Sequence, residues 1–232
     1  GCTADNESTT LGREGSDYTA ALLANILEAE NVTIWKDVEG VMSADPKEFS
    51  EAVYLERLSF DEVIEMSYYG AQIIHPKTIQ PLQQKNIPLL VKCFLQPALP
   101  GTIIHKQRVK QLPPITIIKR NMVLVHLQSK RFDFVDEKTV GFVYHTLAKQ
   151  GLKPSLVQTG AIGLQFCVED KPEQLQNVAV VLEDIFNVQV EKDLQLLTVR
   201  HYLPNQIQEV LAKYAVVLAQ QTPTTFQVVF RG

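Results

Sequence analysis

Residues 9–21, TTLGREGSDYTAA, place a loop with two glycines directly before a stretch rich in Ala and Leu. This stretch predicts a helix over residues 18–30, with Ser16 or Asp17 capping its first turn. Unpaired backbone N–H groups and the helix dipole favour an anion at such a helix start. Short glycine motifs also recur by chance, so the loop fits a plain turn and cap equally well.

Helices and strands alternate after this loop, which predicts an α/β layer structure. A capping box at Ser59 and Glu62 opens a helix that we expect to stop at Gly70. Pro76 suits the first position of a further helix. A Pro-rich segment ends the region, so we expect a first domain over residues 1–111. The strands expected beside these helices are residues 32–35 and 88–94.

The order of elements changes beyond residue 111. Strands and helices follow one another as βαββαβ and then as βαββ, an order typical of ferredoxin-like α+β units. We expect one unit over residues 112–191 and an incomplete one over 192–232, which lacks the last helix and strand. An incomplete unit exposes a strand edge and an apolar face, so we expect that edge to pair with the first unit or with a second chain. The apolar residues of that face are Val216, Val217, Val228 and Val229.

The composition excludes several classes of protein. The chain has 232 residues, of which 45% are hydrophobic and 21% are charged, as in globular proteins. A net charge of −4 without a basic block argues against a nucleic-acid partner, and no apolar run approaches the roughly 20 residues of a membrane span. The three cysteines and five histidines form no metal motif, and the odd number of cysteines favours a reducing, cytoplasmic compartment.

Lys36 and Asp37 follow a predicted strand, at the edge where open α/β sheets bind their ligands. A lysine at this edge can neutralise a nucleotide phosphate as a point charge, although a solvated Lys–Asp pair is the simpler interpretation. Trp35 is expected in the core, together with Tyr68 and Tyr69.

Several motifs occur in an order that resembles the aspartate kinases, from the carboxyl-terminal half of their kinase domain onward. The resemblance is specific over residues 9–104 and looser beyond, where the ferredoxin-like units resemble the paired ACT regulatory domains of that family. The family's lysine-phenylalanine-glycine-glycine-threonine segment is not in this sequence, so we expect part of a longer protein to precede Gly1. The motifs are TLGREGSDYTAA (10–21), WKDVEGV (35–41), DP (45–46), GAQIIHP (70–76) and PGT (100–102).

The resemblance implies transfer of the γ-phosphoryl group of ATP to the β-carboxylate of L-aspartate, with Mg²⁺ carried by the nucleotide. This reaction opens the synthesis of lysine, threonine and methionine. Asp17 and Lys36 would be catalytic, with Asp17 orienting lysines rather than acting as a base. The implied aspartate-binding residues are Arg13, Glu14, Gly15 and Ser16, and the implied ATP-binding residues are Lys36, Asp37, Met42, Lys47, Gln72 and Ile73.

Some of these positions depart from the common pattern of the family. Many members have Thr where Lys36 stands and Lys where Gln72 stands, whereas plant-type members share the pairing found here. We interpret the pairing as compensation, in which Lys36 supplies the positive charge that Gln72 lacks. Glu14 stands where glycine is usual, and its side chain would narrow the aspartate pocket or add a charge to its rim.

The ACT resemblance implies a homodimer that binds an end-product amino acid as its effector. The matching effector-binding positions are Pro154, Ser155, Thr159 and Gly160. Because Ser155 and Ala161 carry no acid, we expect threonine or methionine to bind at least as readily as lysine. The alternative to a kinase is a non-catalytic amino-acid-binding regulatory module. We expect this chain alone to lack kinase activity in either case.

Overall fold

The computed structural model describes residues 2–10, 15–131 and 133–232 of the chain. These residues form two compact units, the first ending at Ile117 and the second beginning at Ile118. The division falls inside a strand, a few residues after the Pro-rich segment at which the sequence predicts a boundary. Each unit has its own hydrophobic core.

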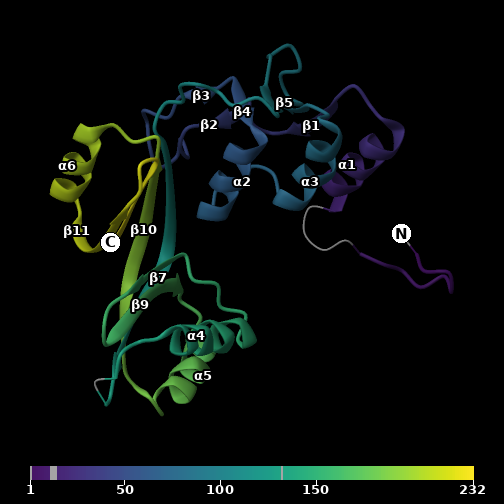
Figure 1. Ribbon diagram of the computed structural model, residues 1–232. Coiled ribbons are helices and arrows are strands. Elements are labelled where there is room, and N and C mark those ends of the chain that lie inside the picture. The colour runs from purple at the N-terminus through teal and green to yellow at the C-terminus, as the bar shows by residue number, and fades with distance from the viewer. Residues whose placement is uncertain (1, 11–14, 132) are drawn as a thin grey trace. The chain divides into compact units, whose positions relative to one another are not determined.

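In its described part, the first unit combines three helices with a four-stranded sheet and a two-stranded ribbon (Figure 1). Its elements are α1 (Gly15–Leu27), β1 (Val32–Lys36), β2 (Val41–Met42), β3 (Tyr54–Leu55), β4 (Arg57–Ser59), α2 (Phe60–Tyr69), α3 (Pro76–Lys85), β5 (Leu89–Cys93) and β6 (Thr102–His105). The sheet has the order β1-β5-β6-β4 and is mixed, since β1–β5 and β4–β6 are parallel and β5–β6 is antiparallel. α1 and α3 lie side by side, and the Asn25 amide donates a 2.6 Å hydrogen bond to the Pro81 carbonyl oxygen between them. The α/β layer predicted for this region is confirmed.

Local sequence signals fix the ends of α2 and α3. The Ser59 hydroxyl caps α2 by accepting a 3.2 Å hydrogen bond from the Glu62 backbone N–H. α2 ends at Gly70, whose φ of 113° suits a residue without a Cβ. α3 begins at Pro76, and His75 Nδ1 accepts from the Lys77 N–H at 3.1 Å. Both helices therefore lie where the sequence predicts them.

The second unit is built on a six-stranded sheet with the order β11-β12-β10-β7-β9-β8 (Figure 1). Its elements are β7 (Ile115–Ser129), α4 (Glu137–Lys149), β8 (Leu156–Thr159), β9 (Gly163–Glu169), α5 (Pro172–Leu182), β10 (Phe186–Arg200), α6 (Pro204–Lys213), β11 (Ala215–Gln221) and β12 (Thr225–Arg231). The chain order from β7 to β10 is βαββαβ, and α6, β11 and β12 repeat its second to fourth elements. The predicted ferredoxin-like order is confirmed.

The two faces of this sheet carry different cores. Val123, Val125 and Leu127 of β7 lie in a cluster with apolar residues of α4 and α5, which pack beside each other (Figure 1). Met122 and Leu124 alternate with them and lie in a second cluster with residues of β8 to β12. β7 therefore carries apolar side chains on both faces in its middle.

Two expectations about the end of the chain are corrected by the structure. β10 is one continuous strand of 15 residues, whereas the sequence predicts two short strands there. Val228 and Val229 are fully buried because β12 lies between β10 and β11, so the expectation that both belong to an uncovered face is wrong. The outermost strands of the described sheet are β11 and β8.

The aromatic residues expected in the first core lie partly at the surface. Trp35 and Tyr68 are each 49% exposed, whereas the sequence predicts burial. The ammonium group of Lys92 lies 5.6 Å from the centroid of the Trp35 ring, a cation–π contact between neighbouring strands. Among the described residues, none of the helices has the length and apolar character needed to cross a bilayer.

Candidate functional site

Asp17 and Lys36 form an ion pair in the first unit. Lys36 is the last residue of β1, and its carbonyl oxygen accepts a 2.9 Å hydrogen bond from the Phe94 N–H just after β5. Asp17 lies in the first turn of α1. The Lys36 Nζ is 3.5 Å from the Asp17 Oδ2. The structure thus brings together the two residues that the resemblance implies are catalytic.

The ion pair is only partly exposed to solvent. The Asp17 and Lys36 side chains are 18% and 28% exposed. Solvent therefore screens this pair less than it screens a surface pair, and an anionic ligand can still reach the ammonium group.

The first turn of α1 surrounds Asp17 with polar groups. Gly15, Ser16 and Asp17 have helical backbone, so the expectation that Ser16 or Asp17 caps a helix starting at residue 18 is wrong. The Ser16 hydroxyl donates to the Asp17 Oδ1 at 3.5 Å, and the Thr19 hydroxyl donates to the Gly15 carbonyl oxygen at 2.7 Å. Backbone N–H groups at this helix end favour negative charge, on Asp17 or on a ligand.

The turn after β1 is held by close packing. A Cβ atom on Gly40 would lie 2.5 Å from the Tyr54 ring and 2.7 Å from the Thr102 hydroxyl, so only glycine fits there. The Thr102 hydroxyl accepts from the Val41 N–H at 2.8 Å and donates to the Leu55 carbonyl oxygen at 2.7 Å. Burial raises the pKa of the Tyr54 phenol. These contacts fix the chain between Lys36 and Met42.

The other predicted nucleotide-binding residues lie on three segments of the first unit. Asp37 and Lys47 are exposed, and Met42 is half-buried in β2. Gln72 is exposed in the segment after α2, where the half-buried Ile73 packs against the core. A nucleotide contact for any of these five residues stays a prediction.

Two predicted aspartate-binding residues, Arg13 and Glu14, lie outside the described residues. The structure therefore describes only Gly15 and Ser16 of that group, both at the start of α1.

The predicted effector-binding residues fall into two separate groups in the second unit. Pro154 and Ser155 precede β8, whereas Thr159 ends β8 and Gly160 follows it. The Ser155 hydroxyl accepts a 3.1 Å hydrogen bond from the ammonium group of Lys119. Burial, together with the charge of Lys153, lowers the pKa of Lys119. The two groups lie at opposite ends of the strand, and only Thr159 and Gly160 line the cavity described next.

A cavity of about 450 Å³ lies beside Thr159 and Gly160. Several polar side chains that line it come from four adjacent strands, β7, β8, β9 and β10, or from the turn between β8 and β9. Sequence reasoning missed them because their spacing matches no motif, although strand alternation in β7 and β9 would have put some of them on one face. These missed residues are His126, Gln128, Gln158, Gln165, Asn187 and Gln189.

A smaller cavity of about 200 Å³ lies where the segment before α4 passes the segment after α5. The Lys130 ammonium donates to the Glu183 carbonyl oxygen and ties the two segments together. Asp136 caps α4 by accepting from the Thr139 N–H at 2.8 Å. This cavity therefore lies along the connection between β7 and α4.

The sequence predicts that all three cysteines are packing residues, which the structure confirms for Cys93 and Cys167 but not for Cys2, which is exposed. Cys93 and Cys167 are buried free thiols, and burial raises the pKa of Cys167 to about 12. A thiol with so high a pKa is a poor nucleophile at neutral pH. Among the described residues, no three His, Cys, Asp or Glu side chains gather in a way that could hold a metal ion.

Comparison with known proteins gives one family and several relatives. Residues 1–93 match the amino acid kinase family. Bifunctional aspartokinase/homoserine dehydrogenase 2 of Zea mays, a chloroplastic protein, is 50% identical over 105 residues, which are 45% of this chain and 12% of that protein. Chloroplastic aspartokinase 3 of Arabidopsis thaliana is 32% identical over 194 residues, covering 75% of this chain and 34% of that protein. The chain thus spans no more than about a third of these relatives.

The similarity extends to a solved structure. E. coli aspartokinase III in complex with aspartate and ADP matches 100% of this chain with a TM-score of 0.82 and 27% identity, over 56% of its own chain. The same enzyme in complex with lysine and aspartate matches with a TM-score of 0.77 and 27% identity, over 55% of its chain.

Proposed function

We propose, from this chain's membership of the aspartate kinase family, that its first unit supplies part of a site where ATP phosphorylates L-aspartate. The observation that carries the proposal is the Lys36–Asp17 ion pair, which joins a strand end to a helix start. E. coli aspartokinase III binds aspartate and ADP, and its fold matches that of this chain.

The charge of the reactants explains why such a site needs fixed cations. An oxygen of the aspartate β-carboxylate attacks the γ-phosphorus of ATP while the bond to the ADP oxygen breaks. Both reactants are anionic, so catalysis depends on positioned positive charges and backbone donors more than on covalent groups of the protein. Mg²⁺, carried by the nucleotide, would neutralise part of the phosphate charge.

In this proposal Lys36 is the cation that stabilises the transferring phosphoryl group. Asp17 holds the Lys36 ammonium in place through the 3.5 Å ion pair and does not act as a base. Arg13 binds a carboxylate of aspartate, since a guanidinium fits a carboxylate in a fork geometry. Backbone and hydroxyl donors of Gly15 and Ser16 complete the aspartate site, with Glu14 at its rim.

The nucleotide would lie against the segments that follow β1, β2 and α2. Asp37 follows β1, Met42 ends β2 and Lys47 comes after it, whereas Gln72 and Ile73 follow α2. Gln72 is neutral, whereas many family members have a lysine at this position. Lys36 therefore supplies the positive charge that neutralises the phosphates.

The second unit is proposed to be regulatory. Its ferredoxin-like order fits an ACT-type unit that binds an end-product amino acid and forms a homodimer. E. coli aspartokinase III binds lysine in one of its solved structures. The effector positions Pro154 and Ser155, and Thr159 and Gly160, lie at the two ends of β8, and only the second pair lines the large cavity. The free, buried thiols agree with a reducing compartment such as the cytoplasm.

The kinase proposal is tested on Lys36 in the protein that carries this segment together with an amino-terminal kinase lobe. Lys36→Thr should lower kcat about 100- to 1,000-fold, because removal of one positioned donor to a developing anion has effects of this size. Gln72→Lys added to Lys36→Thr should recover part of the rate. Hydroxylamine trapping of aspartyl phosphate measures both.

The matched control is Lys85→Thr. Lys85 is also ion-paired, since its Nζ lies 2.8 Å from the Glu28 Oε1. Lys85 is the last residue of α3 and Glu28 follows the last residue of α1, whereas Asp17 lies in the first turn of α1. Its replacement should leave kcat unchanged. Near-normal turnover by Lys36→Thr would contradict the proposal.

A further inference from the structure

The large cavity of the second unit lies on a face of the sheet that changes from apolar to polar. His126, Gln165 and Gln158 stand opposite one another on β7, β9 and β8 and form one row across three strands. The next row on the same face, Leu124–Cys167–Leu156, is entirely buried. The row of His126, Gln165 and Gln158, called the polar row below, thus marks the edge of the buried part of this face.

The cavity is lined by neutral hydrogen-bonding groups. Beyond the polar row, Gln128, Asn187 and Gln189 add three more side-chain amides. None of the described lining residues is Asp, Glu, Lys or Arg. An ionic side chain that bound among these amides would therefore find no opposite charge in the described lining.

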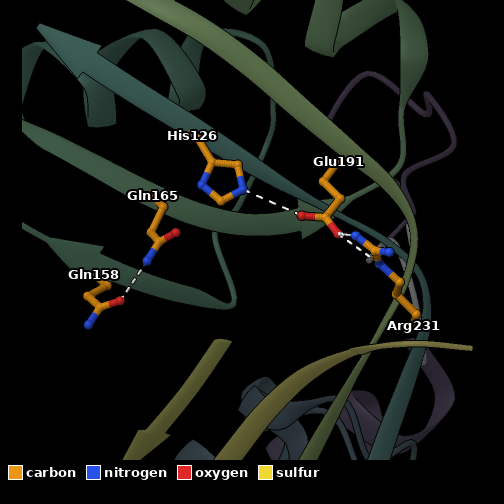
Figure 2. A network of polar contacts seen from close by, with 5 residues as sticks. All are labelled: His126, Gln158, Gln165, Glu191 and Arg231. Carbon is orange, nitrogen blue, oxygen red and sulfur yellow. Dashed lines mark hydrogen bonds and ion pairs between the residues drawn. The ribbon is translucent and has the colours of Figure 1, made fainter. Parts of the chain in front are cut away.

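The one titratable lining residue is held by a partner outside the cavity. His126 Nε2 lies 3.7 Å from the Glu191 Oε2, and Glu191 in turn accepts from the Arg231 guanidinium at 2.8 and 3.1 Å (Figure 2). The imidazole therefore points toward Glu191, and the charge of Glu191 is already matched by Arg231. His126 is thus contacted from outside the cavity, and the other polar side chains that line the cavity are neutral.

The two amides of the polar row are hydrogen-bonded to each other. Figure 2 shows the Gln165 amide pointing toward Gln158, to whose Oε1 its Nε2 donates a 2.6 Å hydrogen bond. Each amide has two N–H groups and an oxygen with two lone pairs, so this bond leaves donor and acceptor capacity on both residues. A ligand that carries one donor and one acceptor side by side fits this arrangement.

We propose that this cavity binds a small solute whose side chain ends in a carboxamide, namely free glutamine or asparagine. The ligand carboxamide extends the Gln165–Gln158 pair by donating to one amide and accepting from another. Its α-ammonium and α-carboxylate stay toward the exposed Gln158, Thr159 and Gly160, in contact with water. Lysine and glutamate are disfavoured because each would bring an unmatched charge to the amides.

Glutamine or asparagine would be the effector of the proposed regulatory unit. Only the consequence of binding, control of a kinase, rests on the proposed function. Binding itself is measured on the 232-residue chain by calorimetric titration, without any kinase assay. If the chain does not bind glutamine, the Lys36 variants still test the kinase proposal. If the kinase proposal fails, the titration still tests glutamine binding.

The titration compares ligands that differ in one group. L-glutamine and L-glutamate have nearly the same shape, and glutamine should bind at least tenfold more tightly. L-asparagine has the same carboxamide on a side chain one methylene shorter, so its affinity shows which of the two amino acids fits. L-lysine and L-threonine are included because the sequence analysis names them as possible effectors. Equal or weaker binding of glutamine than of glutamate or lysine would overturn the proposal.

Variants locate the site. Gln165→Leu keeps the size of the side chain but removes its amide, and should weaken glutamine binding at least tenfold. Gln220→Leu is the matched control, an exposed glutamine on β11 outside the cavity, and should change nothing. Unchanged binding by Gln165→Leu would overturn the proposal. Light scattering gives a second test, in the absence of glutamine. A parent chain that is dimeric and a Gln165→Leu variant that is monomeric would overturn the proposal, because a second copy would then cover this face.

Discussion

The two units build their candidate sites from opposite kinds of side chain. The first unit brings an ammonium and a carboxylate to 3.5 Å, whereas the large cavity of the second is lined by five amides and has no Asp, Glu, Lys or Arg among its described residues. Stabilising a transferring phosphoryl group needs fixed charge, but reversible recognition of a small solute needs hydrogen bonds that form and break at low cost. The difference agrees with a catalytic first unit and a sensing second unit.

The two sites also differ in how much of each lies within this chain. All the described groups around the cavity come from β7 to β10 of one unit. The kinase site of the resemblance uses a further segment that is not in this sequence. The two sites should therefore respond differently when the 232-residue chain is studied by itself.

The largest expected effect is complete loss of phosphoryl transfer by the 232-residue chain alone. Groups that clamp a phosphoryl group act as a unit, so part of a clamp retains little of its rate enhancement. Hydroxylamine trapping should detect no aspartyl phosphate above the control without protein. The same preparation should still titrate with glutamine. Aspartyl phosphate formation above that control would show that this chain holds a complete site.

The next largest effect is expected from Gly163→Ala, which alters only the second site. A Cβ atom on Gly163 would lie 2.5 Å from the Leu127 carbonyl oxygen, a backbone atom of the paired strand. β7 and β9 would have to separate, so the second unit should lose about 2 kcal/mol of stability. Glutamine binding should fall with it, because β7 and β9 carry two residues of the polar row.

Two probes separate the units in that experiment. Hydrogen exchange of β9 peptides should accelerate, whereas the unfolding transition reported by Trp35, the single tryptophan, should not move, since Trp35 belongs to the first unit. Gly160→Ala is the control, because its Cβ would meet only the Gly163 carbonyl oxygen at 3.4 Å. Equal exchange in Gly163→Ala and the parent chain would contradict the close strand approach.

Much of the fold follows from local sequence signals. Ser59, Glu62 and Gly70 fix α2 because capping depends on neighbouring residues alone. The continuous β10 could not be predicted in the same way. Its middle contains the charged run Glu191-Lys192-Asp193, and Asp193 has a φ of 58°, so the pattern resembles a turn between two strands. Pairing across the sheet overrides that local signal.

The two candidate sites also differ in how far local sequence predicts them. Lys36 and Asp37 follow a strand, a position that points to a ligand from the sequence alone. The polar row joins residues 126, 158 and 165, and only strand register brings them together. The separation of Ser155 from Thr159 follows from an extended strand between them, and the sequence already predicts a strand over residues 152–158.

The smallest expected effect comes from Gly141→Ala in α4, which should leave both sites unchanged. A Cβ atom on Gly141 would have no other atom within 4 Å, and glycine inside a helix is less stable than alanine. The variant should therefore stabilise the second unit by about 0.5–1 kcal/mol, measured by urea unfolding at several protein concentrations. Glutamine affinity should not change, because α4 packs on the Val123–Val125 face and His126 faces the other side. Destabilisation that grows with protein concentration would instead show that a second copy packs against α4 at Gly141, and it would place the dimer contact on the helical side of this unit, away from the cavity.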